Sequence, residues 1–387
     1  MTKRIYDVDA YCREFKARVL SCEKNGDGYE VVLDKTAFFP EGGGQAADKG
    51  TIDGIEVYDV QIKDGNIVHK THGMITVGIE AECKLDWELR FARMQSHSGE
   101  HIVSGIVHSR FGFNNVGFHM SGLEMTVDFD GILTQTDIDE LEKLANFAVY
   151  SNAKITVSYP TTEESAQIDF RSKLDDIEDL RLVTIEGVDC CACCAPHVSR
   201  TGEIGVIKII DFTPDRGGTR LTVLAGFEAF CDYSRLNSSN KRLMKSLSSP
   251  RATVAENAER YLELAEKLRE ENGALARRLA WSELAPERTG DGAYAFAEKL
   301  TYDELRHCSN MLSDEGCELC LLFSSDGTGK YIYVVSSKER DTRSIVKRLN
   351  ESFDGRGGGK PNYAQGIIAP ESRDAVEAFV TGILNEG

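Results

Sequence analysis

The stretch CCAPHVSRTGEIG, residues 193–205, contains a cysteine and a histidine four positions apart. Cys193 and His197 are both of the side-chain types that bind zinc, and their spacing lets both reach one ion. A second pair, His97 and His101, lies in HSGEHIVSG, where helical spacing would put both imidazoles on one face. Together the two pairs supply three imidazoles and one thiolate, which is a complete ligand set for one zinc ion per chain.

Some details of this metal site stay open in the sequence. Cys194 could replace Cys193 as the sulfur ligand, because both lie in the cysteine-rich run 190–194. Four protein ligands are typical of a structural zinc, whereas a hydrolytic zinc needs a position for water or substrate. Glu100 directly precedes the second histidine, whereas the base of an HExxH protease follows the first. We therefore expect Glu100 to be solvated or to lie behind the ligands.

Length and charge limit the function classes. A chain of 387 residues accommodates two or three domains. Its net charge of −18 opposes non-specific nucleic-acid binding, so an RNA partner would need locally concentrated positive charge. The sequence has no apolar run of membrane-spanning length and no signal-like N-terminus, so we expect a cytoplasmic protein. In that compartment, clustered cysteines indicate metal binding, while the isolated pair Cys317 and Cys320 lies in an apolar run and should be core.

The hydrophobic pattern predicts an α+β chain with four segments. Residues 1–88 contain short alternating runs between glycine turns, which predict a small β-barrel. Residues 89–233 should form a zinc-containing α+β domain, residues 234–288 a helical linker, and residues 289–387 a compact α/β unit.

The linker has a heptad pattern. Apolar residues fall at a and d positions over about four heptads, namely Val254, Ala258, Tyr261, Ala265, Leu268, Leu275 and Leu279. The pattern fits either one long amphipathic helix or a coiled-coil arm, and the heptads favour a homodimer.

Two glycine-rich stretches are candidates for ligand contact. DKTAFFPEGGGQAADKG (34–50) has three consecutive glycines, which let a ligand approach the backbone, and residues 38–40 (Phe-Phe-Pro) should anchor it. DGRGGGKPNYAQG (354–366) combines glycines with Arg356, Lys360 and an aromatic residue. A basic loop of this kind suits a phosphate backbone or a stacked base. The alternative is a surface loop that covers a sheet edge.

These motifs, taken in order, resemble a known family. TAFFPEGGGQAADKG, HSGEH and CCAPHVSRTGEIG resemble the editing domain of alanyl-tRNA synthetases and of its free-standing relatives, the AlaX family. GRGGGKPNYAQG resembles the C-terminal DHH-associated domain of the same enzymes. The editing motifs begin at residue 36, which leaves no room for an aminoacylation domain and indicates the long free-standing form.

The resemblance implies a zinc-dependent aminoacyl-tRNA hydrolase that removes serine, with glycine as a second candidate, from alanine tRNA. It implies zinc ligation by four side chains, namely His97, His101, Cys193 and His197. It implies that Thr36 recognises the serine hydroxyl and that Gln45 lies beside the substrate end. It assigns tRNA binding to the C-terminal domain, where the candidate residues are Arg356, Gly357, Gly358 and Lys360.

Departures and rival functions remain. The chain reads CCAPHV where CGGTHV is common, so Pro196 replaces a threonine, and HSGEH where HTATH is common. Editing domains of threonyl-tRNA synthetases share both ligand pairs and remove serine from threonine tRNA. A non-catalytic RNA-binding module with a structural zinc is a second rival. A phosphodiesterase is disfavoured, because the sequence contains no DHH tripeptide.

Overall fold

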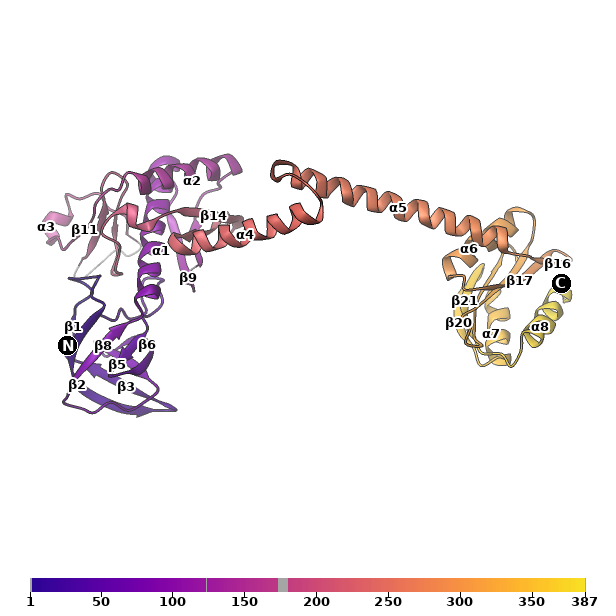
Figure 1. Ribbon diagram of the computed structural model, residues 1–387, viewed down its shortest axis with the longest axis horizontal. Helices are drawn as coiled ribbons and strands as arrows, with labels where there is room; N and C mark the ends of the chain where they lie inside the picture. The colour runs from indigo at the N-terminus through magenta and orange to yellow at the C-terminus, as the bar shows by residue number, and fades with distance from the viewer. Residues whose placement is uncertain (1, 123, 173–179, 387) are drawn as a thin grey trace. The chain divides into compact units, whose positions relative to one another are not determined.

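The structure is a computed structural model that describes residues 2–122, 124–172 and 180–386 (Figure 1). The chain divides into two compact units, residues 1–242 and 243–387. The predicted mixed α+β class is confirmed, whereas the domain borders proposed at residues 88, 233 and 288 stay predictions. Among the described residues, no helix combines the length and the apolar character needed to cross a bilayer.

The predicted N-terminal barrel is confirmed. Its region contains the strands β1 (Lys3–Arg4), β2 (Glu14–Asn25), β3 (Gly28–Leu33), β4 (Lys35–Thr36), β5 (Gly50–Ile52), β6 (Ile55–Lys63), β7 (Asn66–Thr71) and β8 (Glu80–Leu85). The barrel closes in the order β2-β3-β7-β6-β5-β8, while β1 pairs with β4. Residues of β8 alternate between exposed and buried, as the sequence pattern requires. Phe38 and Phe39 lie in the barrel core and anchor the first glycine-rich stretch, as predicted.

The rest of the first unit packs sheets and helices around one long helix, α1 (Trp87–Ile106), which continues into a π-helical segment (Val107–Phe111). The further elements are β9 (Asn115–Ser121), β10 (Glu124–Phe129), α2 (Gln135–Tyr150), β11 (Ile155–Ser158), α3 (Thr162–Ser165), β12 (Leu182–Ile185), β13 (Asp189–Ala192), a 3-10 turn (Thr201–Ile204), β14 (Ile207–Asp215) and β15 (Gly218–Ala225). The sheets have the orders β14-β15-β10-β9 and β11-β12-β13. Helix α1 runs from the barrel towards α2 (Figure 1) and packs on β10, β13 and β15.

Two capping interactions explain where the helices of this unit begin. The Asp86 carboxylate accepts a hydrogen bond from the Leu89 N–H at 3.1 Å and starts α1. Thr134 and Asp137 form a reciprocal capping box at the start of α2. The first cap places both predicted ligand histidines in the middle of a long regular helix.

The predicted linker region contains two helices in the part of the chain that the structure describes. Helix α4 (Gly226–Ser246) begins directly after β15, and a 3-10 turn (Arg251–Thr253) separates it from α5 (Val254–Glu283). The predicted border at residue 234 therefore falls inside α4 and stays a prediction, and the exposed aromatic residue Phe227, which is 64% exposed, lies near the start of this helix. The heptads lie on the single helix α5, and Leu268 and Leu275 are exposed on it. Coiled-coil pairing stays a prediction.

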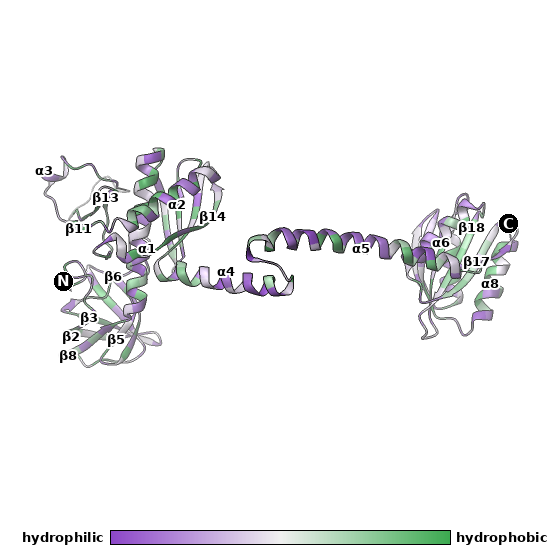
Figure 2. Cartoon of the chain, turned by 45° about the horizontal axis from the view of Figure 1, so that its top comes forward, coloured by the Kyte–Doolittle hydropathy of each residue, from purple (hydrophilic) through white to green (hydrophobic). Residues whose placement is uncertain are grey.

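The second unit ends in an α/β fold. Its elements are β16 (Glu287–Thr289), β17 (Gly292–Glu298), α6 (Tyr302–Asp314), β18 (Leu319–Ser325), β19 (Tyr331–Ser337), α7 (Thr342–Ser352), β20 (Arg356–Lys360), β21 (Tyr363–Ile368) and α8 (Arg373–Asn385). The sheet order is β16-β17-β18-β19-β21-β20, and apolar strands fill its centre (Figure 2). Helices α7 and α8 cover one face and α6 covers the other. Cys317 and Cys320 are buried core residues, as predicted.

The second glycine-rich stretch is not a loop. Arg356–Lys360 forms the edge strand β20, which pairs with β21 in antiparallel register. The prediction of a loop was wrong because glycine is depleted in strands, and here close packing overrides that preference. A Cβ at Gly357 would lie 2.1 Å from the Tyr333 hydroxyl, so only glycine fits there.

Candidate metal centre

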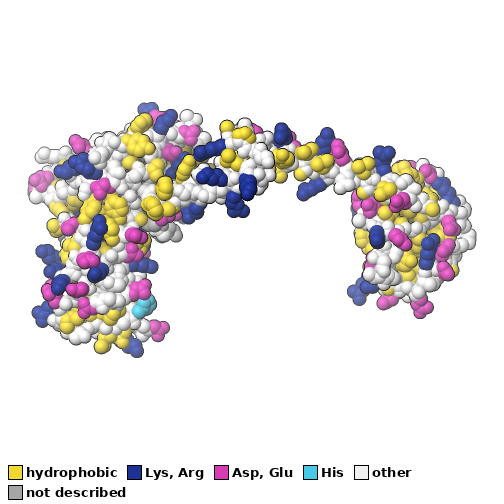
Figure 3. Space-filling view, in the orientation of Figure 1, with side chains coloured by type: hydrophobic (Ala, Val, Ile, Leu, Met, Phe, Trp, Pro, Cys, Tyr) yellow, Lys and Arg dark blue, Asp and Glu magenta, His cyan; other side chains and the backbone are white. Residues whose placement is uncertain are grey.

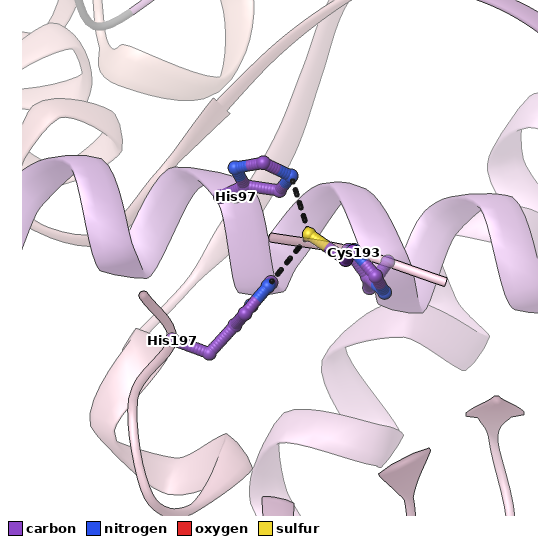
Figure 4. Close-up of side chains that lie close together, drawn as sticks. His97, Cys193 and His197 are labelled. Atoms are coloured by element: carbon purple, nitrogen blue, oxygen red, sulfur yellow. Dashed lines mark hydrogen bonds between the residues drawn. The ribbon is translucent and has the colours of Figure 1, made fainter. Parts of the chain in front are cut away.

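Four predicted ligands meet inside the first unit. His97 and His101 project from one face of α1, and Cys193 and His197 come from the segment after β13. The Cys193 sulfur lies 3.6 Å from His97 Nε2 and 3.3 Å from His197 Nε2 (Figure 4). All four candidate ligand atoms lie within 4.8 Å of one another. Residues about 90 positions apart in the sequence therefore form one cluster.

The donor set fits zinc. Zinc bonds of about 2.0 Å to nitrogen and 2.3 Å to sulfur in a tetrahedron separate those ligands by roughly 3.5 Å. The two sulfur–nitrogen distances given above bracket that value. Imidazole and thiolate are ligands that zinc prefers over oxygen donors. Cys193, and not the neighbouring exposed Cys194, is the sulfur that joins the cluster.

Each histidine is oriented by a different acceptor. The nitrogens that face away from the cluster contact an amide, a hydroxyl and a carboxylate: His97 Nδ1 with Gln45 Oε1 at 2.9 Å, His197 Nδ1 with Ser98 Oγ at 3.0 Å, and His101 Nδ1 with Asp189 Oδ2 at 3.1 Å. The amide and carboxylate oxygens only accept, and Ser98 Oγ also accepts from the Val198 N–H. In the neutral imidazoles of His97 and His101, Nδ1 therefore carries the proton and the Nε2 lone pair faces the cluster. Zinc on His197 Nε2 would likewise put the His197 proton on Nδ1, directed at Ser98 Oγ.

A second acidic and sulfur-containing group supports this centre. Asp189 accepts two hydrogen bonds from Arg171, at 2.7 and 2.8 Å, and it also accepts from His101. Cys191 lies beside these two residues, and burial raises the pKa of its thiol to about 11. Because the guanidinium already neutralises the carboxylate and the thiol stays protonated, this group positions His101 and does not form a second cation site.

Electrostatics favour the ligand form of the cysteine. Burial disfavours the Cys193 thiolate, but the electrostatic interaction with the surrounding imidazoles and the hydrogen bonds that they donate to the sulfur outweigh it, so the pKa of the thiol lies well below its usual value. Burial lowers the pKa of His197 to about 3. At His101, burial is outweighed by the hydrogen bond with Asp189, which raises its pKa well above the usual value. The thiolate is the species that binds metal.

The first glycine-rich stretch closes over the centre. Gly43 and Gly44 have positive φ, and the Gly44 carbonyl accepts from the Met120 N–H of β9 at 3.1 Å. A Cβ at Gly44 would lie 2.6 Å from Phe118, whose ring contacts His97. This close approach places Gln45 on His97. The Gln45 Nε2 is buried and has no acceptor within the described part of the chain.

Thr36 lies in the barrel, and its hydroxyl contacts His69 and not the metal cluster in the described residues. His69 Nδ1 faces the Val31 carbonyl at 3.0 Å, which only accepts, so Nδ1 carries the proton. His69 Nε2 must then accept from the Thr36 hydroxyl at 2.8 Å. The same hydroxyl accepts from the Phe38 N–H at 3.1 Å, so one lone pair remains on it.

The expectation that Glu100 is solvated is wrong. Its side chain is buried, and one carboxylate oxygen accepts from Ser104 and Asn115. The other oxygen lies 3.9 Å from His101 Nε2, beside the candidate metal position. Glu100 therefore lies beside the ring nitrogen of His101 that faces the cluster, and not behind the candidate ligands.

The C-terminal candidates belong to the second unit. Residues 358–360 of β20 line an open depression of about 750 Å³ together with residues of α6, among them Arg306, with residues of β19, and with Lys338, which directly follows β19. The Arg306 guanidinium lies over the Tyr363 ring at 5.1 Å. Acidic and basic side chains are interspersed over the face drawn in Figure 3.

Sequence reasoning missed the residues that support the ligands. Ser98, Asp189 and Arg171 reach the centre only through tertiary contacts, and no spacing rule marks them. The sole sequence signal was that Ser98 is the next residue after a predicted ligand.

Three family descriptions match parts of the chain. Residues 9–89 match "tRNA synthetases class II (A)", residues 180–243 match "Threonyl and Alanyl tRNA synthetase second additional domain", and residues 290–386 match "DHHA1 domain". The matches fall on the barrel, on the segment with the second ligand pair, and on the C-terminal α/β fold.

Curated relatives match nearly the whole chain. Alanyl-tRNA editing protein Aarsd1 of Rattus norvegicus is 29% identical over 95% of this chain and 94% of its own. Alanyl-tRNA editing protein AlaX-L of Pyrococcus horikoshii is 26% identical over 95% of both chains. Alanine–tRNA ligase of Pyrococcus abyssi is 28% identical over 98% of this chain but only 43% of the ligase. The resemblance predicted from the motifs is thereby confirmed, and the chain is a homologue of the free-standing alanyl-tRNA editing proteins.

Proposed function

We propose that this protein hydrolyses the ester bond of mischarged alanine tRNA, chiefly Ser-tRNA(Ala), with Gly-tRNA(Ala) as a second substrate. The observation that carries the proposal is the convergence of His97, His101, Cys193 and His197, each histidine fixed by its own acceptor. The names of the relatives supply the substrate class. One zinc ion per chain would be held by these four side chains.

The chemistry of the centre suits ester hydrolysis. A bound zinc would supply Lewis acidity, either to water or to the substrate carbonyl, provided that its coordination opens or expands. The buried Gln45 Nε2, which lacks an acceptor in the described chain, is placed to donate to the carbonyl oxygen as negative charge develops on it. Gln45 would thus orient His97 with one amide atom and bind substrate with the other.

Thr36 would select serine by accepting its hydroxyl hydrogen. Because His69 and Phe38 use the donor and one lone pair of the Thr36 hydroxyl, only an accepting position remains for a substrate. A serine side chain can donate to it, whereas alanine and glycine cannot. This difference adds discrimination where a missing methyl group alone is worth only about 1–3 kcal/mol.

The substitution Thr36→Val tests this selection. We expect the ratio of kcat/KM for Ser-tRNA(Ala) over Gly-tRNA(Ala) to fall about 10-fold, since one hydrogen bond of about 1–1.5 kcal/mol is lost. Thr36→Ser, which keeps the hydroxyl, serves as the control. A ratio that stays the same in Thr36→Val would place serine recognition elsewhere.

The C-terminal fold would bind the body of the tRNA. Arg356, Gly357, Gly358 and Lys360 form an exposed basic edge on which a phosphate backbone could lie. The exposed heptads of α5 would pair two chains as a homodimer. The cytoplasmic location stays a proposal. No described helix could span a membrane, and this finding does not by itself give a location.

Deacylation of Ser-tRNA(Ala), Gly-tRNA(Ala), Ala-tRNA(Ala) and Ser-tRNA(Thr) by the purified, metal-loaded protein tests the proposed function. We expect fast loss of serine from alanine tRNA and little reaction with the other three, except for slower loss of glycine. Preference for Ser-tRNA(Thr) would favour threonine editing. No turnover of any substrate, with zinc bound and the fold intact, would favour a structural zinc in an RNA-binding protein.

A further inference from the structure

The first glycine-rich stretch contacts α1 at three successive places. Going along the stretch, the contacts move backwards along the helix, and they are Gln45 with His97, Ala47 with Arg93, and Asp48 with Arg90. Arg93 and His97 are four residues apart and so lie on one face of α1, about 6 Å apart along its axis. Arg93 therefore lies one helical turn from the metal centre, beneath the same stretch that contributes Gln45.

The two arginines of this series differ sharply in their partners. Arg90 forms a buried ion pair with Asp48 and also donates to the carbonyl groups of Ala10 and Ala37. Arg93 donates from Nη1 to the Ala47 carbonyl at 2.5 Å and makes no ion pair with any residue that the structure describes. One arginine is thus neutralised, and the other is not.

The unpaired charge of Arg93 is buried. Only 5% of the residue is exposed, and its Nε has no hydrogen-bond acceptor in the described chain. Burial lowers the pKa of the Arg93 guanidinium. The charges of Asp48 and Asp86 oppose this shift, but Asp48 is already paired with Arg90. A buried cation without an ion-pair partner is costly, and a buried donor without an acceptor needs an explanation such as a bound ligand or ion. An anionic ligand would satisfy both the charge and the free Nε–H of Arg93.

We infer that Arg93 binds the phosphate that joins the last two nucleotides of the aminoacylated RNA end. The inference rests on the proposed function. In that substrate the amino acid carries a cationic amine and an esterified carboxyl, so phosphate is the anionic group available. The helical turn between Arg93 and His97 is similar in length to one nucleotide step, which lets the ester lie at the metal centre while the phosphate reaches the guanidinium. Arg93 is a positioning residue for the ester.

The test uses three seryl esters and the full, metal-loaded chain. The first is 3′-seryl-adenosine without a phosphate, the second is the seryl ester of the trinucleotide CCA, and the third is that trinucleotide with a neutral methylphosphonate as its last linkage. We expect the wild-type protein to hydrolyse the second ester with a kcat/KM about 10- to 100-fold above the other two. Arg93→Gln should lose this advantage and leave the first and third esters unchanged. Arg93→Lys should retain part of it.

A matched control removes an exposed positive charge from the barrel. Lys16→Gln should treat all three esters as the wild type does, because Lys16 lies at the surface and, among the described residues, pairs with Glu82 alone. A structural role for Arg93 would instead slow all three esters alike in Arg93→Gln, and that result would overturn the inference. So would a wild-type protein that does not distinguish phosphate from methylphosphonate, and this comparison stands even if Arg93→Gln fails to fold.

Binding measurements separate this inference from the proposed function. Non-hydrolysable 3′-amide analogues of the second and third compounds report the same phosphate contact without turnover. A wild-type preference for the charged analogue of about 10-fold or more supports the Arg93 contact even if no ester is hydrolysed, in which case only the proposed activity fails. Equal affinity for both analogues overturns the Arg93 contact.

Discussion

The candidate metal centre and the glycine-rich strand β20 are built in opposite ways. At the centre, every histidine is at least 95% buried and has a specific partner for its second ring nitrogen. On β20, all five residues are exposed, and Arg356 and Lys360 make no ion pair within the described chain. A preorganised centre holds reacting groups in place at the cost of burying polar atoms. An exposed basic edge can bind a long, variable phosphate backbone but fixes no single atom.

Removal of two candidate ligands should have the largest effect of the changes considered. In His97→Ala with His101→Ala, we expect bound zinc to fall from one per chain to near zero and deacylation to fall on the order of 10³-fold, since several kcal/mol of charge stabilisation are lost. Metal analysis and single-turnover kinetics measure both. The control is His72→Ala with His108→Ala, two exposed histidines outside the centre, which should keep zinc and activity. Full zinc occupancy in the ligand variant would show that the ligands are assigned wrongly.

Acid should weaken the first unit through His69. Burial lowers the pKa of His69 to about 4, whereas in an unfolded chain it is near 6.5. Between these values the unfolded state binds the extra proton, so the free energy of unfolding falls as pH drops from about 6.5 to 4, by up to about 3 kcal/mol. His69→Gln should remove this part of the pH dependence. Urea unfolding of both proteins at pH 7 and pH 4.5 measures the loss of unfolding free energy between the two pH values. An equal loss in the wild type and in His69→Gln would contradict the assignment.

Asp189 should affect the zinc affinity of the candidate centre and not the overall stability of the fold. Asp189→Asn leaves a weaker acceptor for His101 Nδ1, so we expect zinc affinity to fall about 10- to 100-fold in a chelator competition. The matched control is Asp128→Asn, because Asp128 also accepts two hydrogen bonds from an arginine, Arg220, but lies away from the ligands. Equal losses of zinc affinity in both variants would mean that Asp189 acts through the fold alone.

The exposed strand should show the smallest effects. Arg356→Gln and Lys360→Gln should each weaken tRNA binding several-fold and lower the slope of log K against log salt by about 1. Hydrolysis of seryl-adenosine, which lacks the tRNA body, should not change. Lys347→Gln, another exposed charge of the same unit, is the control. A changed rate with seryl-adenosine would contradict the division of labour between the two regions.

Prediction from the sequence worked where a pattern is local. The two histidines of the first candidate pair lie one helical turn apart on α1. The cysteine and the histidine of the second pair lie in one short segment after β13, so both spacings can be read in the sequence. The barrel followed from alternating runs between glycine turns. Prediction failed for β20, because glycine in a strand depends on a neighbour, here Tyr333, that no local pattern reveals.

The sequence by itself determined the donor types, their pairing along the chain and the family resemblance, because these depend on residue identity and short spacing. Only the tertiary structure decided which cysteine joins the cluster, which acceptor orients each histidine, and which arginine is left without a counter-ion. Those outcomes depend on contacts between residues that are distant in sequence and on the burial that those contacts create. Arg90 and Arg93 cannot be told apart from the sequence. They differ in the folded chain, because Asp48 forms its ion pair with Arg90.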